Sequence, residues 1–247
     1  MTLKDFFAEN PKVALAFSGG ADSAYLLCAG VRLGAEIKAY YLRTAFQPEF
    51  ELADARRLAA ELGAELEVVA FDILSAPGVA ENPPDRCCSC KRAMFTELKR
   101  RASADGFPLL IDGTNASDNE EERPGMRALR ELGVRSPLRD CGITKDELRR
   151  LSRQEGLFTW NKPAYSCLAT RVAQGRRVTP EALSRIELAE NAMFALGFSD
   201  FRVRVTDDTA KIQVTAPQLP SLIAKREEVL AELGKLFGSV TLDLRCR

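Results

Sequence analysis

The sequence contains no histidine among its 247 residues. That absence excludes Ser-His-Asp and Cys-His catalysis and every metal site built on imidazole. Any chemistry must therefore rest on Cys, Asp, Glu, Lys, Arg, Ser or a bound cofactor. An excess of one charge is also lacking, because 35 Lys and Arg residues balance 35 Asp and Glu residues and leave a formal net charge of zero. A protein that coats nucleic acid without sequence preference needs an excess of basic residues, so we expect no nucleic-acid partner. A local basic patch is still compatible with this charge balance.

Long apolar runs are missing as well. The first ten residues lack the basic start and the apolar stretch of a signal peptide. The uncharged stretch at residues 23–31 is far shorter than the roughly 20 apolar residues that cross a bilayer. We therefore expect a soluble, cytoplasmic protein with no membrane partner. The seven cysteines are then expected to be reduced, metal-binding or catalytic rather than disulfide-paired.

Strand and helix patterns alternate along the first part of the chain. Apolar runs predict strands at residues 13–17, 37–42, 65–71 and 108–112, and helical patterns occupy residues 22–34, 48–62, 91–105 and 144–155. Such alternation, with strands apolar on both faces, is typical of a parallel, doubly wound α/β sheet. We predict this domain over residues 1–172.

The pattern changes in the last third of the chain. It predicts a helix at residues 180–196, paired strands at 201–206 and 211–215, a helix at 219–237 and a last strand at 240–244. These elements predict a small α+β domain over residues 173–247.

The segment Ser18-Gly-Gly-Ala-Asp-Ser23 lies directly between the first strand and its helix. Open α/β sheets bind ligands at the carboxyl ends of their strands. Gly19 and Gly20 let the backbone approach an anion, and the N–H groups of the helix start bind phosphate oxygens. Ser18 and Ser23 add hydroxyl donors, while the Asp22 carboxylate suits a metal ion. The alternative is a plain glycine turn with a Ser or Asp helix cap.

This segment is neither a Walker A loop, which needs Gly-Lys-Ser/Thr, nor a dinucleotide fingerprint. It resembles the PP-loop of ATP pyrophosphatases, which cleave ATP to AMP and pyrophosphate while they adenylylate a substrate. Asp112-Gly-Thr-Asn115, at the end of the fourth strand, resembles a second segment of that superfamily; taken alone, it is equally a simple turn. The resemblance implies ATP and Mg²⁺ as cofactors and adds Thr114 and Asn115 to the ATP-binding residues.

Three cysteines cluster in Cys87-Cys-Ser-Cys90, which contains a Cys-x-x-Cys. Thiolates at that spacing can hold zinc or an iron–sulfur cluster, or form a redox pair. A closed zinc site needs four ligands, and the sequence offers neither a second Cys-x-x-Cys nor a histidine. Three thiolates on a 4Fe-4S cluster leave one iron open, which can carry an extra sulfide. Surface thiols without any ion are the plain alternative.

The third thiolate would come from Cys167, in a Pro- and Ser-containing loop beside Lys162 and Arg171, two cations that favour a thiolate. Isolated cysteines in regular structure are usually inert packing residues. Cys28 and Cys141 are interpreted in that way.

Several segments together are similar to the LarE family, which inserts sulfur into pyridinium-3,5-biscarboxylic acid mononucleotide to build the nickel-pincer cofactor of lactate racemase. The segments are Asn82-Pro-Pro-Asp-Arg-Cys87, Arg123-Pro-Gly125, Arg135-Ser-Pro-Leu138, Trp160-Asn-Lys-Pro163 and Ser166-Cys-Leu-Ala-Thr-Arg171. The likeness covers nearly the whole chain. It implies that the C-terminal domain binds the substrate and that it also joins the chains into a homo-oligomer larger than a dimer.

The resemblance also implies a mechanism. ATP would adenylylate a substrate carboxylate, and a sulfur nucleophile at Cys167 would displace AMP to give a thiocarboxylate. Members with one such cysteine give up its sulfur and retain dehydroalanine. Members that also have Cys-x-x-Cys resemble cluster enzymes, so Cys87, Cys90 and Cys167 would hold a 4Fe-4S centre supplied by sulfide or a sulfur donor.

The substrate phosphate needs its own cationic pocket. Arg202 and Arg204 lie two residues apart on one face of a predicted strand, which could equally be a solvated face. The resemblance implies that they bind the phosphate, with Arg171 and Glu190 as further substrate-binding residues.

Other functions remain open at this stage. A PP-loop tRNA-thiolating enzyme would use the same loop and cysteines, but it would need a basic RNA surface that the balanced charge does not favour. A glutamine- or ammonia-using ligase leaves the cysteines unexplained. A non-catalytic nucleotide sensor conflicts with an intact Ser18, Asp22 and Ser23.

Overall fold

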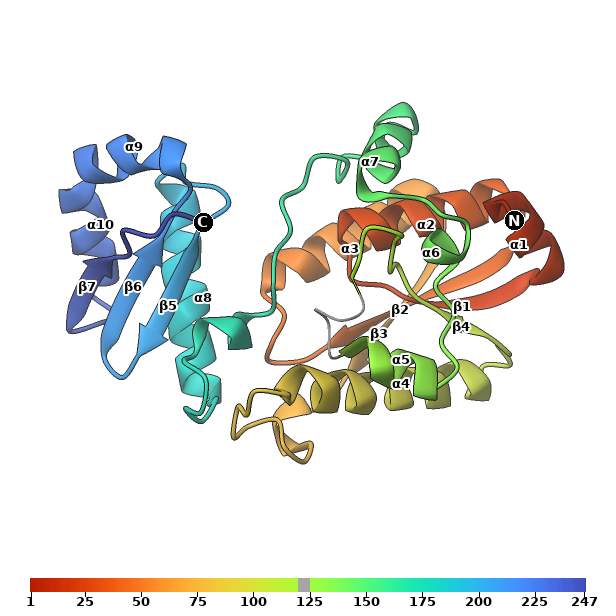
Figure 1. The fold of residues 1–247 in the computed structure, drawn as a ribbon, viewed down its shortest axis with the longest axis horizontal. Helices are drawn as coiled ribbons and strands as arrows, with labels where there is room; N and C mark the ends of the chain where they lie inside the picture. Colours follow the sequence, from red (N-terminus) through yellow and green to blue (C-terminus); the bar gives the residue numbers. More distant parts are fainter. Residues whose placement is uncertain (120–124) are drawn as a thin grey trace. The chain divides into compact units, whose positions relative to one another are not determined.

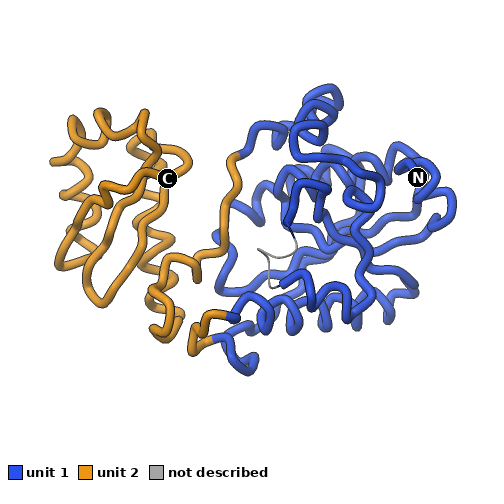
Figure 2. The backbone as a smooth tube through the Cα atoms, viewed as in Figure 1, with its two compact units in different colours: residues 1–79, 85–162 blue, residues 80–84, 163–247 orange. Residues whose placement is uncertain are grey.

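The computed structural model describes residues 1–119 and 125–247, which divide into two compact units (Figure 2). Unit 1 comprises Met1–Val79 and Asp85–Lys162, and unit 2 comprises Ala80–Pro84 and Pro163–Arg247. Of the segment Arg123-Pro-Gly125, the first two residues lie outside the described residues.

Unit 1 is built on a four-stranded parallel sheet in the order β3-β2-β1-β4 (Figure 1). The strands are β1 Lys12–Ala16, β2 Glu36–Arg43, β3 Glu65–Ala70 and β4 Leu110–Ile111. The first three fall within two residues of the predicted strands, and the two-residue β4 lies within the predicted fourth. The registers Val13↔Ile37 and Lys38↔Glu65 are parallel, so the predicted fold class is confirmed.

Alternate residues of the strands pack into two separate apolar clusters, one on each face of the sheet. Leu15 and Tyr41 belong to the cluster formed with α1, α2, α3 and α7, whereas Ala14 and Tyr40 belong to the cluster formed with α4 and α5. These helices span Leu3–Glu9, Ala21–Arg32, Glu49–Leu62, Lys145–Gln154, Arg86–Ala104 and Gly125–Glu131. Burial on both faces explains why the strands show no polar alternation.

Some helices of unit 1 differ from the sequence prediction. Helices α1, α5 and the four-residue α6, Pro137–Asp140, were not predicted, and α4 begins at Arg86 rather than at residue 91. After Arg86, its first residues are Cys and Ser, whose weak helix propensity masks the start. The Cys-x-x-Cys therefore lies on a helix.

Unit 2 contains a three-stranded sheet in the order β5-β6-β7, with strands Arg202–Thr206, Thr209–Gln213 and Ser239–Leu242. The first two pair antiparallel around a turn in which Asp207 has φ +52°, as predicted from the Asp-Asp pair. Helix α8, Pro180–Ala195, has Thr179 as its N-cap. The single helix predicted at 219–237 is instead two helices, α9 Leu219–Ala224 and α10 Arg226–Leu233, separated at Lys225.

The division of the chain falls at 162/163 rather than at the predicted 172/173. Residues 163–172 belong to unit 2 because Val172 pairs with Val205 of β5 and because Arg171 binds Glu190 of α8. The segment 80–84 joins them through Asn82, whose carbonyl accepts from the Gly175 N–H at 2.9 Å and whose side chain donates to Ala173 O at 2.9 Å. Within the described ranges, no helix has both the length and the apolar character of a membrane span.

Gly113, just after β4, generates a prediction about how tightly unit 1 is packed. A Cβ at Gly113 would lie 2.8 Å from Ser23 N and 3.1 Å from its Cα, so the backbone would have to move. We expect Gly113→Ala to lower the free energy of unfolding by about 1–3 kcal/mol in urea denaturation.

The matched control is Gly20→Ala. Its Cβ would meet only Ser18 Oγ, at 3.4 Å, which is an ordinary contact. Its stability should therefore stay within about 0.5 kcal/mol of the parent protein. Equal stabilities for the two variants would contradict the close approach of the β4 loop to α2.

Candidate functional site

The Ser18–Ser23 loop connects β1 to α2 and is stabilised by its own hydroxyl groups. Ser23 Oγ lies 3.1 Å from Ser18 Oγ, accepts from Ser18 N–H at 3.3 Å and donates to the Gly20 carbonyl at 3.3 Å. The Gly20 N–H donates to Ser18 Oγ at 3.3 Å. The two serines thus hold the loop in one conformation at the carboxyl end of the sheet.

Two features of this loop suit an anion. Gly19 has φ +71°, and a Cβ there would lie 3.1–3.2 Å from Glu51 and Ala55 of α3, so both the conformation and the space require glycine. Helix α2 has Gly20 as its N-cap and receives no hydrogen bond from a capping side chain. The Ser or Asp cap of the alternative interpretation is therefore absent at Gly20, and phosphate binding by the N–H groups at the start of α2 stays a prediction.

The segment after β4 lies beside this loop, because Gly113 packs against Ser23. The buried Asp112 carboxylate accepts from Thr114 Oγ1 at 2.5 Å and from Ser136 Oγ at 2.6 Å. Asn115 Oδ1 accepts from the Ser117 N–H at 2.9 Å. The structure thus brings Thr114 and Asn115 to the loop, and their role in ATP binding stays a prediction.

Asp22, the predicted metal ligand, already holds a cation. Its Oδ1 lies 2.6 Å from Nζ of Lys145, and both side chains are about one-third exposed, at 32% and 29%. The two residues are 123 positions apart, and no local pattern marks Lys145 as a site residue. Sequence reasoning missed it for that reason.

The Cys-x-x-Cys occupies the first turns of α4, in unit 1. Cys87 is exposed, and Cys90 is half-buried with its thiol 3.5 Å from Met94 Sδ. Their spacing of three residues places both on one face of the helix. Cys88 is buried, and its sulfur accepts from Nη2 of Arg127 at 3.6 Å. Cys28 is fully buried, and burial raises the pKa of its thiol, as expected for the predicted inert residue.

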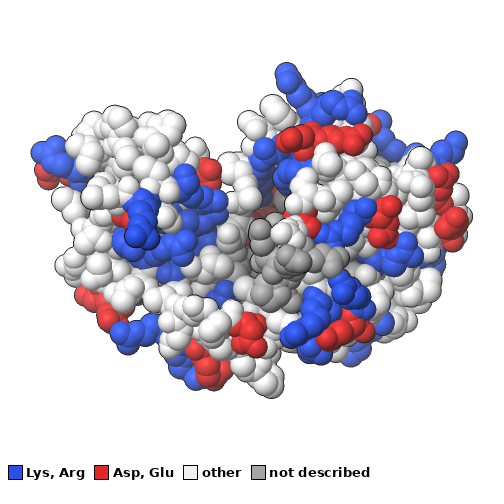
Figure 3. Space-filling model, in the orientation of Figure 1, with Lys and Arg blue, Asp and Glu red and all other residues white. Residues whose placement is uncertain are grey.

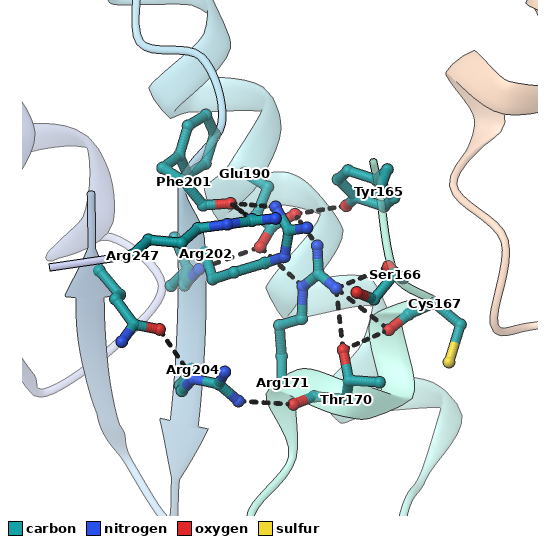
Figure 4. Close-up of polar contacts among 12 residues, drawn as sticks. Tyr165, Ser166, Cys167, Thr170, Arg171, Glu190, Phe201, Arg202, Arg204 and Arg247 are labelled. Atoms are coloured by element: carbon teal, nitrogen blue, oxygen red, sulfur yellow. Dashed lines mark hydrogen bonds and ion pairs between the residues drawn. The ribbon is translucent and has the colours of Figure 1, made fainter. Parts of the chain in front are cut away.

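Cys167 is half-buried in unit 2 and precedes a short 3-10 helix, Leu168–Arg171. The cations expected to favour its thiolate have other partners. Arg171 Nη1 donates to the Cys167 carbonyl at 3.2 Å and to the Ser166 carbonyl at 2.6 Å, while Figure 4 shows the Cys167 sulfur directed away from this guanidinium. Lys162 Nζ lies 2.7 Å from Asp54. The effect of these two cations on the Cys167 thiol stays a prediction, and the Arg171 guanidinium also fixes the backbone of the loop.

Glu190 of α8 connects three parts of unit 2 (Figure 4). Its Oε1 accepts from Arg171 Nε at 2.9 Å and from the Val203 N–H of β5 at 2.9 Å, and its Oε2 accepts from Arg171 Nη2 at 3.1 Å and from the Tyr165 hydroxyl. The Arg171 and Glu190 side chains are 0% and 1% exposed. Both were predicted as substrate ligands and that role stays untested, while the geometry makes them the support of the Cys167 loop.

Arg202 and Arg204 share one face of β5, as their spacing predicts. Arg202 is buried, with Nη2 2.8 Å from the Ala164 carbonyl, whereas Arg204 is exposed and donates to the Thr170 carbonyl at 2.9 Å. Arg247 shares the Ala164 carbonyl at 3.3 Å. Burial, together with the charges of Arg171 and Arg247, lowers the pKa of Arg202 to about 10, so its guanidinium group is still cationic at neutral pH.

Figure 3 shows Lys and Arg side chains gathered on this face of unit 2, over the region of β5, β6 and the C-terminus in Figure 1. This gathering of cations is a local basic patch; on β5 itself Arg204 is exposed, whereas Arg202 is buried. Such a patch exists despite the zero net charge of the whole chain. An anion among these guanidinium groups would reduce their mutual repulsion.

The predicted cluster ligands belong to both units, Cys87 and Cys90 to unit 1 and Cys167 to unit 2. Among residues 1–119 and 125–247, no three Cys, Asp or Glu side chains come together as a metal-binding group.

Comparison with known proteins gives relatives that span nearly the whole chain. A pyridinium-3,5-bisthiocarboxylic acid mononucleotide synthase of Lactiplantibacillus plantarum is 31% identical over 94% of this chain and 86% of its own length. An uncharacterized protein of Synechocystis is 35% identical over 98% of this chain and 92% of its own length. The tRNA-specific 2-thiouridylase MnmA of Thermotoga maritima is 26% identical over 61% of this chain and 54% of its own length. No family model matches the chain.

The buried Arg171–Glu190 pair generates a prediction about stability. Glu190→Gln keeps the shape of the side chain but leaves the Arg171 charge buried without its counter-charge. We expect the free energy of unfolding to fall by about 3 kcal/mol or more in urea denaturation. Glu232→Gln is the control, since the pair of Glu232 with Lys235 is exposed and should contribute within about 0.5 kcal/mol. Similar stabilities for both variants would contradict the structural role of Glu190 in unit 2.

Proposed function

Because this chain belongs to the LarE family of pyridinium-3,5-bisthiocarboxylic acid mononucleotide synthases, we propose that it uses ATP to transfer sulfur to pyridinium-3,5-biscarboxylic acid mononucleotide. ATP-dependent sulfur transfer is the activity that its LarE and PP-loop relatives have in common. The observation that carries the proposal is the Ser18–Ser23 loop, held by its own serines at the uncapped start of α2. That geometry suits the phosphates of ATP.

The first step is activation of a substrate carboxylate. A carboxylate oxygen attacks the α-phosphorus of ATP, the bond to the β-phosphate oxygen breaks, and pyrophosphate leaves. The N–H groups of α2 and the hydroxyls of Ser18 and Ser23 bind the phosphates, while Thr114 and Asn115 lie at the same edge of the sheet. The Asp22 carboxylate would hold Mg²⁺ in place of the Lys145 ammonium group, which lies 2.6 Å from it in this structure.

The second requirement is to hold the mononucleotide by its phosphate. Arg202, which is buried, and Arg204, which is exposed, supply guanidinium donors on one face of β5. Arg171 and Glu190 lie behind them as a buried pair. Arg202 is anchored to the Ala164 carbonyl, three residues before Cys167, so substrate binding and the Cys167 loop are joined in one unit.

Sulfur then replaces the activated oxygen. In a sacrificial version, the Cys167 thiolate attacks the acyl carbon and AMP leaves with the former carboxylate oxygen; loss of the Cys167 Cα proton and cleavage of its Cβ–S bond then release the thiocarboxylate and leave dehydroalanine. In the other version, a sulfide attacks the acyl carbon instead, AMP leaves in the same way, and Cys167 stays intact.

In a cluster version, Cys87, Cys90 and Cys167 would hold a 4Fe-4S centre; Cys87 is exposed, Cys90 lies one helical turn from it on the same face of α4, and Cys167 is half-buried. Such a cluster would supply an iron that carries a transferable sulfide, replenished from sulfide or a sulfur donor. We favour this version because the sequence has the Cys-x-x-Cys in addition to Cys167. The product is the thiocarboxylate precursor of the nickel-pincer cofactor of lactate racemase.

A PP-loop tRNA-thiolating activity is the second candidate. It is favoured by the similarity to MnmA, which covers 61% of this chain. The small-molecule substrate is preferred because the LarE relative matches 94% of the chain. We also propose that the chain forms a homo-oligomer, which is compatible with either substrate.

Anaerobic turnover with ATP, Mg²⁺, sulfide and the pyridinium biscarboxylate mononucleotide tests the proposal. Mass spectrometry of product and protein should give more than one thiocarboxylate per chain, with Cys167 intact. Cys167→Ala and Cys87→Ser should each abolish repeated turnover. Cys141→Ser, at a half-buried thiol whose pKa is raised by burial, should turn over like the parent protein.

Two other results would change the proposal. At most one thiocarboxylate per chain, with Cys167 converted to dehydroalanine, would make the chain a sacrificial sulfur donor and remove the cluster. No product, together with ATP cleavage that depends on tRNA, would contradict the small-molecule substrate and establish the thiolation alternative.

A further inference from the structure

The contact between Asp22 and Lys145 is not part of the loop motif and calls for its own explanation. The ammonium group lies 2.6 Å from Asp22 Oδ1, at the start of α2, where the phosphates of ATP are proposed to bind. Both side chains are about one-third exposed, so the pair is reachable by a ligand rather than sealed in the core.

We propose that Lys145 is a nucleotide-binding residue. In the absence of ATP its ammonium group neutralises Asp22; when Mg²⁺ replaces it there, the Lys145 side chain moves and its ammonium group binds the phosphates that leave as pyrophosphate. This proposal rests on the proposed use of ATP. It adds a residue and an exchange of cations that the loop sequence does not contain.

The chemistry of phosphate loops supports this assignment. A Walker A loop carries its own lysine, which reaches the terminal phosphates of the nucleotide. The Ser18–Ser23 loop has no lysine. Lys145 supplies an ammonium group at the equivalent place, the first turn of the helix that follows the loop, although it comes from a residue 123 positions later in the chain.

The position of Lys145 is fixed by contacts other than the ion pair. It is the first residue of α7, whose N-cap Thr144 accepts from the Glu147 N–H. The Lys145 N–H donates to Ser117 Oγ at 2.9 Å, and the Ala116 N–H donates to the Ile143 carbonyl at 2.9 Å. The backbone of Lys145 is therefore held against the segment after β4, while its long side chain can exchange Asp22 for a phosphate oxygen without moving α7.

The exchange predicts effects of opposite sign in one variant. Lys145→Met removes the ammonium group, which frees Asp22 for a metal ion but deprives ATP of a charged donor. In the full chain, calorimetry should therefore give a loss of about tenfold or more in affinity for ATP with Mg²⁺. AMP, which lacks the leaving phosphates, should bind within about twofold of the parent protein. Mn²⁺ without nucleotide, followed by electron paramagnetic resonance, should bind more tightly than to the parent protein.

Arg32→Met is the matched control, because Arg32 joins α2 to Glu155 at the other end of α7 through an ion pair of 2.8 Å. It removes a comparable connection between the same two helices away from the loop. ATP, AMP and Mn²⁺ should all bind to it as to the parent protein. Lys145→Arg, which keeps the charge, should recover part of the ATP affinity.

Unchanged ATP affinity in Lys145→Met would overturn the role of Lys145. A parallel loss of ATP, AMP and Mn²⁺ binding would also overturn it, since that result indicates a structural contact only. Failure of the parent protein to bind ATP would refute the proposed function itself and the role of Lys145 with it. The two failures are therefore distinguishable.

Discussion

The buried ion pair between Arg171 and Glu190 is the interaction on which the organisation of unit 2 depends. One carboxylate accepts from the guanidinium group, from the backbone of β5 and from the Tyr165 hydroxyl. The same guanidinium group donates to the carbonyls of Ser166 and Cys167. A helix, a strand and a loop are thereby fixed to one another. Removal of either partner would leave a buried charge uncompensated, so the pair is costly to break even where it adds little net stability.

In unit 1, polar groups come together at the end of a sheet that is buried on both faces. Parallel strands end at a common edge, and glycine at positions 19 and 113 allows the loops there to pack closely. The hydroxyls of Ser18 and Ser23 bond to each other, and the N-cap residue of α2, Gly20, has no capping side chain. In the proposed function, this edge activates the substrate with ATP, while unit 2 supplies the phosphate-binding arginines and Cys167.

The features that sequence reasoning predicted are those encoded by neighbouring residues. The three longer strands, the glycine loop and the arginine pair on β5 each arise from a short pattern. The contact of Lys145 with Asp22 could not be predicted, because it depends on how α7 packs against α2. Nor could the pairing of Arg171 with Glu190, which directs the guanidinium group away from the Cys167 sulfur. The boundary between the units was misplaced for the same reason, since residues 163–172 belong to unit 2 through these long-range contacts.

The central claim is that the loop at Ser18–Ser23 activates a carboxylate of the mononucleotide, and an isotope experiment tests it directly. Pyridinium-3,5-biscarboxylic acid mononucleotide labelled with ¹⁸O in its carboxylates is supplied with ATP, Mg²⁺ and sulfide, and the nucleotide products are analysed by mass spectrometry. Attack of the carboxylate on the α-phosphorus, followed by displacement by sulfur, leaves one labelled oxygen in AMP for each thiocarboxylate formed. Label in phosphate or pyrophosphate, or thiocarboxylate formed beside unlabelled AMP, would contradict the account.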